Sequence, residues 1–180
     1  MAAKKSESTK KVPKTAAPAE APSPLPPVEA LLPPAALERL RAGFDEAAML
    51  YGADMAVKYP YPPAGPWTDP PGDMFYRTKP LLPHKKREMV LLATLTGQRA
   101  YSELAVHVYW GLMEGLDPDE IANVLLLTSM YTGMPTWSNA IRVLRTALTT
   151  LAKIAAEAET DPTRAQTANL MPVYMAGMRG

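Results

Sequence analysis

A carboxylate and an imidazole lie four residues apart near the middle of this chain of 180 residues. They are Glu103 and His107, in the segment Glu103-Leu104-Ala105-Val106-His107, and His107 is one of only two histidines. On a helix, positions i and i+4 lie on one face about one turn apart, so both side chains can reach one cavity. Proton-transfer chemistry uses this kind of arrangement. The chain has no cysteine, which excludes disulfides and thiol chemistry.

The same face of this helix carries more polar and aromatic side chains. Steps of three and four residues place Trp110 after His107 on one stripe, with Ala100 before the pair and Glu114 at its end. Trp110 would give His107 an apolar wall, and partial burial beside a carboxylate makes the protonation of an imidazole sensitive to its surroundings. The spacing also fits a solvated or interfacial Glu–His pair, which contributes roughly 0.2–0.5 kcal/mol.

Prolines show how the chain around this helix is divided. Eight of the 20 prolines lie in residues 1–34, and eight more lie between Pro60 and Pro83. Residues 1–34 are rich in Lys, Ala and Pro and poor in large apolar side chains. Because they cannot offset the entropy lost on ordering, they are predicted to be a disordered tail. With 47% hydrophobic residues in the chain, residues 35–180 are predicted to form a single helical domain.

Residues 58–83 are predicted to be an irregular segment. Their prolines prevent regular hydrogen bonding, while five aromatic side chains supply apolar surface. A loop of this length without secondary structure fits a lid or an arm that embraces a neighbour, and it fits a wrap over exposed core equally well.

Hydrophobic periodicity and helix-end signals predict an all-α fold. The expected helices cover residues 35–57, 84–96, 100–114, 118–131 and 135–158, with a short one at about 168–178. Gly97 and Gly133 are expected to end the helices before them. Asp117 and Glu120, on either side of the dipeptide Pro118-Asp119, are typical of a capping box that begins the next helix. No segment alternates with a period of two, so no strand is expected.

Composition limits the partners and the compartment. A formal net charge of +1 gives no reason to expect a nucleic-acid partner. No apolar stretch is long enough for a membrane span or a secretory signal, so we expect no membrane partner and a cytoplasmic protein. The basic, Ser-rich start also suggests an organelle transit peptide, although Glu7 and the dense prolines argue against it.

Several short segments between residues 82 and 148 occur in an informative order. They are Lys86-Arg87-Glu88, Leu91-Leu92-Ala93, Glu103-Leu104 followed by His107, Gly115, Glu120-Ile121, Val124-Leu125-Leu126 and Tyr131-Thr132-Gly133-Met134-Pro135. In this order and spacing they resemble the carboxymuconolactone decarboxylase family, whose superfamily includes the alkylhydroperoxidase D proteins. The resemblance implies an alkylhydroperoxidase D-like helical bundle that forms trimers or hexamers, with pockets near the subunit contacts.

The resemblance also assigns positions. The two cysteines of the peroxidase branch fall on Ala100 and Glu103, so disulfide-based peroxide reduction is excluded. The glutamate that begins the proton relay in that branch falls on Glu88. The decarboxylase branch fits better, because its Glu-Leu-x-x-His pattern is kept from Glu103 to His107. Many decarboxylases have a histidine where this chain has Leu127, which implies a more apolar substrate or loss of the original reaction.

The resemblance implies that carbon dioxide is expelled and that the remaining enolate-like carbon must be protonated. We expect His107 to donate and accept the proton. Glu103 is expected to fix its tautomer or support the imidazolium, and Glu88 to be a second relay member or base.

Three further residues are candidates for substrate binding. Arg99 could attract a substrate carboxylate, and Trp110 and Tyr131 could line the pocket. An exposed arginine in a turn is also often only solvated, and aromatic residues at such positions often serve packing.

A metal site would need His84, Glu103 and His107 to converge, and their spacing matches no ligand pattern. We therefore expect no metal and no cofactor, and we expect His84 to lie in the exposed first turn of its helix.

Two functions remain open from the sequence. One is a cofactor-independent decarboxylase, or a related lyase or isomerase, acting on a small lactone or carbonyl carboxylate. The other is a non-catalytic oligomeric helical protein used for assembly or partner binding. Fold alone does not choose between them. Convergence of Glu88, Glu103 and His107 on an enclosed cavity would favour the enzyme. A homo-oligomer is expected in either case, since many apolar helix faces need cover.

Overall fold

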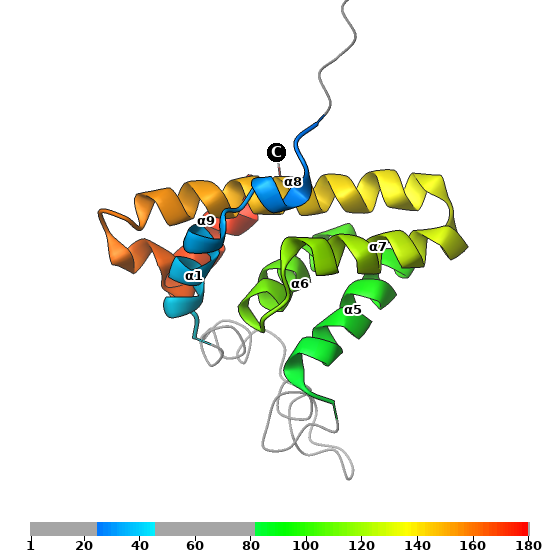
Figure 1. Cartoon of the computed structure of the whole chain (residues 1–180), viewed down its shortest axis with the longest axis horizontal. Helices are drawn as coiled ribbons and strands as arrows, with labels where there is room; N and C mark the ends of the chain where they lie inside the picture. Colours follow the sequence, from blue (N-terminus) through cyan, green and yellow to red (C-terminus); the bar gives the residue numbers. More distant parts are fainter. Residues whose placement is uncertain (1–24, 46–81, 180) are drawn as a thin grey trace, which may run out of the picture.

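The computed structural model describes residues 25–45 and 82–179, and these form an all-α fold (Figure 1). The α-helices are α1 (Pro34–Ala42), α5 (His84–Gln98), α6 (Tyr101–Met113), α7 (Pro118–Thr132), α8 (Met134–Glu157) and α9 (Thr167–Gly177). Two short 3-10 helices, η1 (Val28–Ala30) and η2 (Pro162–Ala165), precede α1 and α9. The described residues contain no strand, which confirms the predicted fold class.

The long helix α8 lies across the other helices, with α1 and α9 toward its C-terminal half and α7 toward its start (Figure 1). Its buried side chains recur at helical spacing, among them Ala140, Leu144 and Leu151, which have no exposed surface. This stripe packs on α6, where Leu104 and Val108 are also fully buried. Because α6 is held on its inner side by apolar packing, the face with His107 has a fixed direction.

The α7 start agrees with the predicted capping box. The Asp117 side chain accepts from the Glu120 backbone N–H at 2.8 Å, and the Glu120 side chain accepts from the Asp117 N–H at 3.0 Å. Lys85 on α5 reaches Glu120 at 2.8 Å between Nζ and Oε2. The Lys85 hydrogen bond, followed by the one from the Asp117 backbone, holds the pKa of the Glu120 carboxyl below its usual range. Gly133 ends α7 as predicted.

The predicted end of α5 at Gly97 is wrong by two residues. The helix continues to Gln98, and Arg99 is the C-cap in the left-handed conformation with φ of 60°. Its backbone N–H bonds to the Thr96 carbonyl, and the next N–H, from Ala100, bonds to the Leu95 carbonyl at 2.9 Å. Arginine therefore takes the position that glycine often occupies at a helix end.

The first helix is shorter than the predicted 35–57. It ends at Ala42, and Gly43 to Asp45 are not helical. Tertiary contacts with α9 explain this end, since Thr167 donates its N–H to the Gly43 carbonyl and accepts the Asp45 N–H on its hydroxyl at 2.8 Å. The rest of that predicted helix lies outside the described residues, as do the predicted tail up to residue 24 and residues 58–81.

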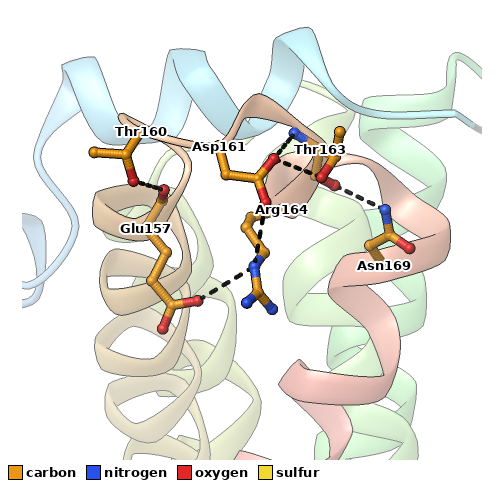
Figure 2. A network of polar contacts seen from close by, with 6 residues as sticks. All are labelled: Glu157, Thr160, Asp161, Thr163, Arg164 and Asn169. Atoms are coloured by element: carbon orange, nitrogen blue, oxygen red, sulfur yellow. Dashed lines mark hydrogen bonds and ion pairs between the residues drawn. The ribbon is translucent and has the colours of Figure 1, made fainter.

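The connection from α8 to α9 is organised by Asp161, as Figure 2 shows. Its carboxylate accepts from the Thr163 backbone N–H at 3.1 Å and from the Thr163 hydroxyl at 2.6 Å. These bonds, the side-chain one first, hold the pKa of Asp161 below its usual range. Asn169 of α9 donates to the Thr163 carbonyl at 3.0 Å, and Arg164 lies between Asp161 and Glu157. This turn sets the direction in which α9 returns.

α9 is tied to α6 through Tyr174, which is fully buried and donates its hydroxyl to the Ala105 carbonyl. Burial raises the pKa of Tyr174, so the phenol stays neutral and remains a donor. The backbone of α6 two residues before His107 is thus anchored from the far side of the bundle.

We expect Gly43→Ala to destabilise the fold by about 1–3 kcal/mol, because the added methyl group would overpack the contact between Gly43 and Ala165. A Cβ at Gly43 would lie 2.4 Å from the Ala165 carbonyl oxygen, which belongs to the backbone and has little freedom to move. Gly97→Ala is the matched control, since its Cβ would meet only Thr128 Cγ2 at 3.8 Å. In a helix interior alanine is favoured over glycine by roughly 0.5–1 kcal/mol. Urea denaturation of both variants checks the pair, and equal stabilities would contradict this account of the α1 end.

Candidate functional site

His107 is paired with Glu88 of the neighbouring helix. His107 Nδ1 lies 2.8 Å from Glu88 Oε2. The Glu88 side chain has no exposed surface, and the His107 side chain is 19% exposed. A buried carboxylate is costly unless hydrogen bonds satisfy it, and this contact offsets part of the cost of burying Glu88. The arrangement places an inaccessible acid behind an imidazole that can still be reached.

Close packing of α5 on α6 makes this contact possible. Gly111, one turn after His107 on α6, is buried, and a Cβ there would lie 3.7 Å from the Glu88 Cβ. The same Cβ would come within 2.8 Å of a Leu116 methyl group. The absence of a side chain at Gly111 therefore lets α5, Leu116 and the backbone of α6 meet at the level of Glu88.

The pair defines the state of the imidazole. An ionised carboxylate only accepts hydrogen bonds, so Nδ1 of His107 carries a proton when it bonds to Glu88. The second ring nitrogen, Nε2, is then the atom available for proton transfer. A carboxylate in this position also stabilises the imidazolium that forms when Nε2 takes a proton.

Trp110 lies beside His107, as its position on the stripe predicted. The two rings are nearly parallel, with an interplanar angle of 8° and 6.0 Å between centroids. Trp110 is buried, with 6% of its surface exposed. Its indole gives the imidazole an apolar neighbour and limits the directions from which water or a ligand can approach.

A second histidine–carboxylate pair lies on the same two helices. His84 Nδ1 is 3.5 Å from Glu114 Oε2, and the two side chains are 29% and 16% exposed. His84 does lie in the first turn of its helix as predicted, but its side chain is half-buried and not exposed. The sequence held a signal for this pair, because Glu114 ends the stripe of His107 on α6 and His84 lies four residues before Glu88 on α5.

The expected pairing of Glu103 with His107 is not what the structure shows. Glu103 is exposed, in the first turn of α6. The two residues do share a helix face, but Glu88 reaches the ring from the neighbouring helix. There the carboxylate is desolvated and interacts more strongly than an exposed one. Glu88 is therefore hydrogen-bonded to His107, and Glu103 is not.

The other predicted residues are spread over the surface. Arg99 is an exposed helix cap. Tyr131 is 92% exposed and Leu127 is 60% exposed, both on the outer face of α7. Among the predicted substrate-binding residues only Trp110 lies against His107. Arg87, which sequence reasoning left without a role, is 7% exposed.

Two negative findings apply to the described residues. Within them, no three His, Asp or Glu side chains gather in a way that could hold a metal ion. Within residues 25–45 and 82–179, no helix is long and apolar enough to cross a bilayer. A groove of about 610 Å³ does occur between α8 and α9, where Arg145, Lys153 and Glu157 are among its lining residues. No residue of α5 or α6 lines that groove, so it is separate from the His107 pair.

Comparison with known families agrees with this geometry. Residues 68–146, less than half of the chain, match the model of the carboxymuconolactone decarboxylase family, so this segment is similar to that family. The matched segment contains both Glu88 and His107. The all-α bundle is accordingly of the alkylhydroperoxidase D-like type. Comparisons with curated proteins and with solved structures found no match.

A double-mutant cycle distinguishes the two carboxylates. We expect Glu88→Ala and His107→Ala to show a coupling energy of about 1.5–3 kcal/mol in the free energy of unfolding, as for hydrogen bonds to charged groups. Glu103→Ala and His107→Ala should show less than about 0.5 kcal/mol, as for exposed helical pairs. Chemical denaturation of the single and double variants gives both values. Stronger coupling to Glu103 than to Glu88 would contradict the observed pairing.

Proposed function

We propose that the chain is a cofactor-independent enzyme that decarboxylates a small lactone or carbonyl carboxylate, with His107 as general acid and base. The observation that supports it most is the hydrogen bond between His107 Nδ1 and the fully buried Glu88. A partly accessible imidazole held by an inaccessible carboxylate is an arrangement suited to proton transfer. The similarity of residues 68–146 to the carboxymuconolactone decarboxylase family supports the same reaction class.

In this proposal the substrate loses carbon dioxide when the bond between its carboxylate carbon and the neighbouring carbon breaks. The electron pair of that bond moves into the adjacent carbonyl and leaves an enolate. Nε2–H of protonated His107 then delivers its proton to the enolate carbon, and the resulting neutral imidazole regains a proton from water. Glu88 stays hydrogen-bonded to Nδ1 throughout and supports the imidazolium form.

In this proposal the two glutamates have other roles than the sequence suggested. Glu88 takes the part of the orienting carboxylate that the sequence suggested for Glu103. Glu103, exposed in the first turn of α6, forms no hydrogen bond or ion pair with His107 or Glu88. Trp110 supplies an apolar surface next to the ring, which fits a small substrate with a planar conjugated part. A role in assembly alone would give no reason to bury a carboxylate against an imidazole, since the desolvation is costly.

The test is a screen of lactones and β-keto acids for release of carbon dioxide. With a turned-over substrate, we expect His107→Gln to lower kcat by about 10²- to 10⁴-fold, the usual contribution of a positioned acid–base group. Glu88→Gln should also lower kcat, because it removes the charge that supports the imidazolium. Glu159→Gln, an exposed carboxylate after α8, is the matched control. Unchanged turnover in His107→Gln would overturn the assignment. A loss in Glu103→Gln as large as in Glu88→Gln would return the orienting role to Glu103.

We also propose that a second copy of this chain covers the outer face of α7. Large apolar side chains are exposed there and at the start of α8, namely Leu126, Leu127, Met130, Tyr131 and Met134. Between Glu120 and Arg142 the sequence contains no Asp, Glu, Lys, Arg or His. An apolar surface without charge complements another copy of itself and offers nothing to a charged partner.

Light scattering after size-exclusion chromatography tests this surface. We expect a mass of three or six times 19.6 kDa, as the family resemblance implies. The double variant Leu127→Lys, Met130→Lys should dissociate, since it would bury uncompensated charges in the contact. Gln98→Lys, at an exposed position on α5, should leave the mass unchanged. A monomeric parent protein would contradict the proposal.

A further inference from the structure

We propose that His84 and Glu114 form a positioning pair that keeps Glu88 against His107. The two histidine–carboxylate pairs lie along one seam between α5 and α6. On α5, His84 and Glu88 are four residues apart, and on α6, His107 and Glu114 are seven residues apart, so each helix presents its two members on one face. Each imidazole meets a carboxylate of the other helix, at 2.8 Å for His107 with Glu88 and at 3.5 Å for His84 with Glu114.

The need for such a pair comes from the start of α5. Glu88 is the fifth residue of this helix, and the helix begins without a side-chain cap after Pro83. The first N–H groups of a helix have no partner within it, and an uncapped first turn frays readily. The first backbone hydrogen bond, from Arg87 N–H to the Pro83 carbonyl at 3.0 Å, lies in this turn. Fraying would move Glu88 away from His107.

Two side-chain contacts hold the first turn of α5 in different directions. Lys85 bonds to Glu120 and so ties the turn to α7. His84 meets Glu114 and ties it to α6, which is the direction of the contact between Glu88 and His107. The His84–Glu114 pair therefore adds to the packing of α5 on α6 and opposes a separation of the two helices near Glu88.

Helix electrostatics support a dedicated pairing. Glu114 is the C-cap of α6, and His84 is the first residue of α5. A carboxylate at a helix C-terminus and an imidazolium at a helix N-terminus both interact unfavourably with the helix dipole. Neither residue is thus placed to stabilise its own helix. The contact across the seam offsets both effects, and with side chains only 29% and 16% exposed it is less screened than a surface pair.

The inference rests on the proposed function only for its effect on turnover, because the contact itself can be measured without substrate. The chain has two histidines, so nitrogen NMR of the imidazole rings gives few signals, and His84 variants leave His107 alone. At about pH 8, above the usual titration range of histidine, the ring nitrogens show which tautomer is present. In the parent protein we expect His107 to carry its proton on Nδ1, held there by Glu88.

We expect His84→Ala and Glu114→Ala to shift His107 from the Nδ1–H tautomer toward the Nε2–H tautomer. His84→Gln keeps a donor facing Glu114 and should restore the parent spectrum. Lys85→Ala is the matched control, since it breaks the tie to α7 and leaves the seam between α5 and α6 intact. Circular dichroism and a melting curve for each variant establish that the spectra come from folded protein.

An unchanged His107 tautomer in both alanine variants would overturn the inference, and so would an Nε2–H tautomer in the parent protein. An equal shift in Lys85→Ala would also overturn it, because the effect would then reflect general order in the first turn of α5. If the His107 tautomer shifts as expected but no substrate is turned over, the positioning pair is supported and only the proposed function is contradicted.

Discussion

The burial of one carboxylate governs the rest of this structure. Glu88 has no exposed surface, and an isolated ionised group in such a place would be strongly unfavourable. Its hydrogen bond to His107 at 2.8 Å offsets part of that cost. The bond in turn requires α5 and α6 to approach closely, which Gly111 permits because a side chain there would meet Leu116. The close approach of α5 and α6, the burial of Glu88 and the orientation of the His107 ring are therefore linked through one hydrogen bond.

Much of the remaining fold fixes α6, the helix that carries His107. The α8 stripe packs on its apolar side, and Tyr174 of α9 donates to its backbone at Ala105. Arg41 of α1 binds the carbonyl of Leu112 at 2.9 Å, near the C-terminal end of α6. Elements from both ends of the described chain thus hold one helix. A rigid support of this kind suits a site whose proton-transfer group must stay in place.

The contact between Glu88 and His107 does not require cysteine, which this chain lacks. A thiol pair would need two residues at the start of α6, where this chain has Ala100 and Glu103. The contact between Glu88 and His107 does not depend on those positions, because it joins α6 to α5 one turn further along. An acid–base pair can thus remain intact where the positions of a thiol pair hold other residues.

The sequence by itself determined the features that depend on neighbouring residues. Helix periods, the capping box of Asp117 and Glu120 and the end at Gly133 all act within a few residues, so their prediction was correct. Only the tertiary structure decided which carboxylate meets His107, since helical spacing favoured Glu103 and Glu88 lies 19 residues away on another helix. It likewise decided the partner of His84 and the early end of α1, which depends on Thr167 more than 120 residues away. These outcomes depend on how the helices pack. Packing brings together residues that are far apart in the sequence, so a local sequence pattern does not predict which of them will meet.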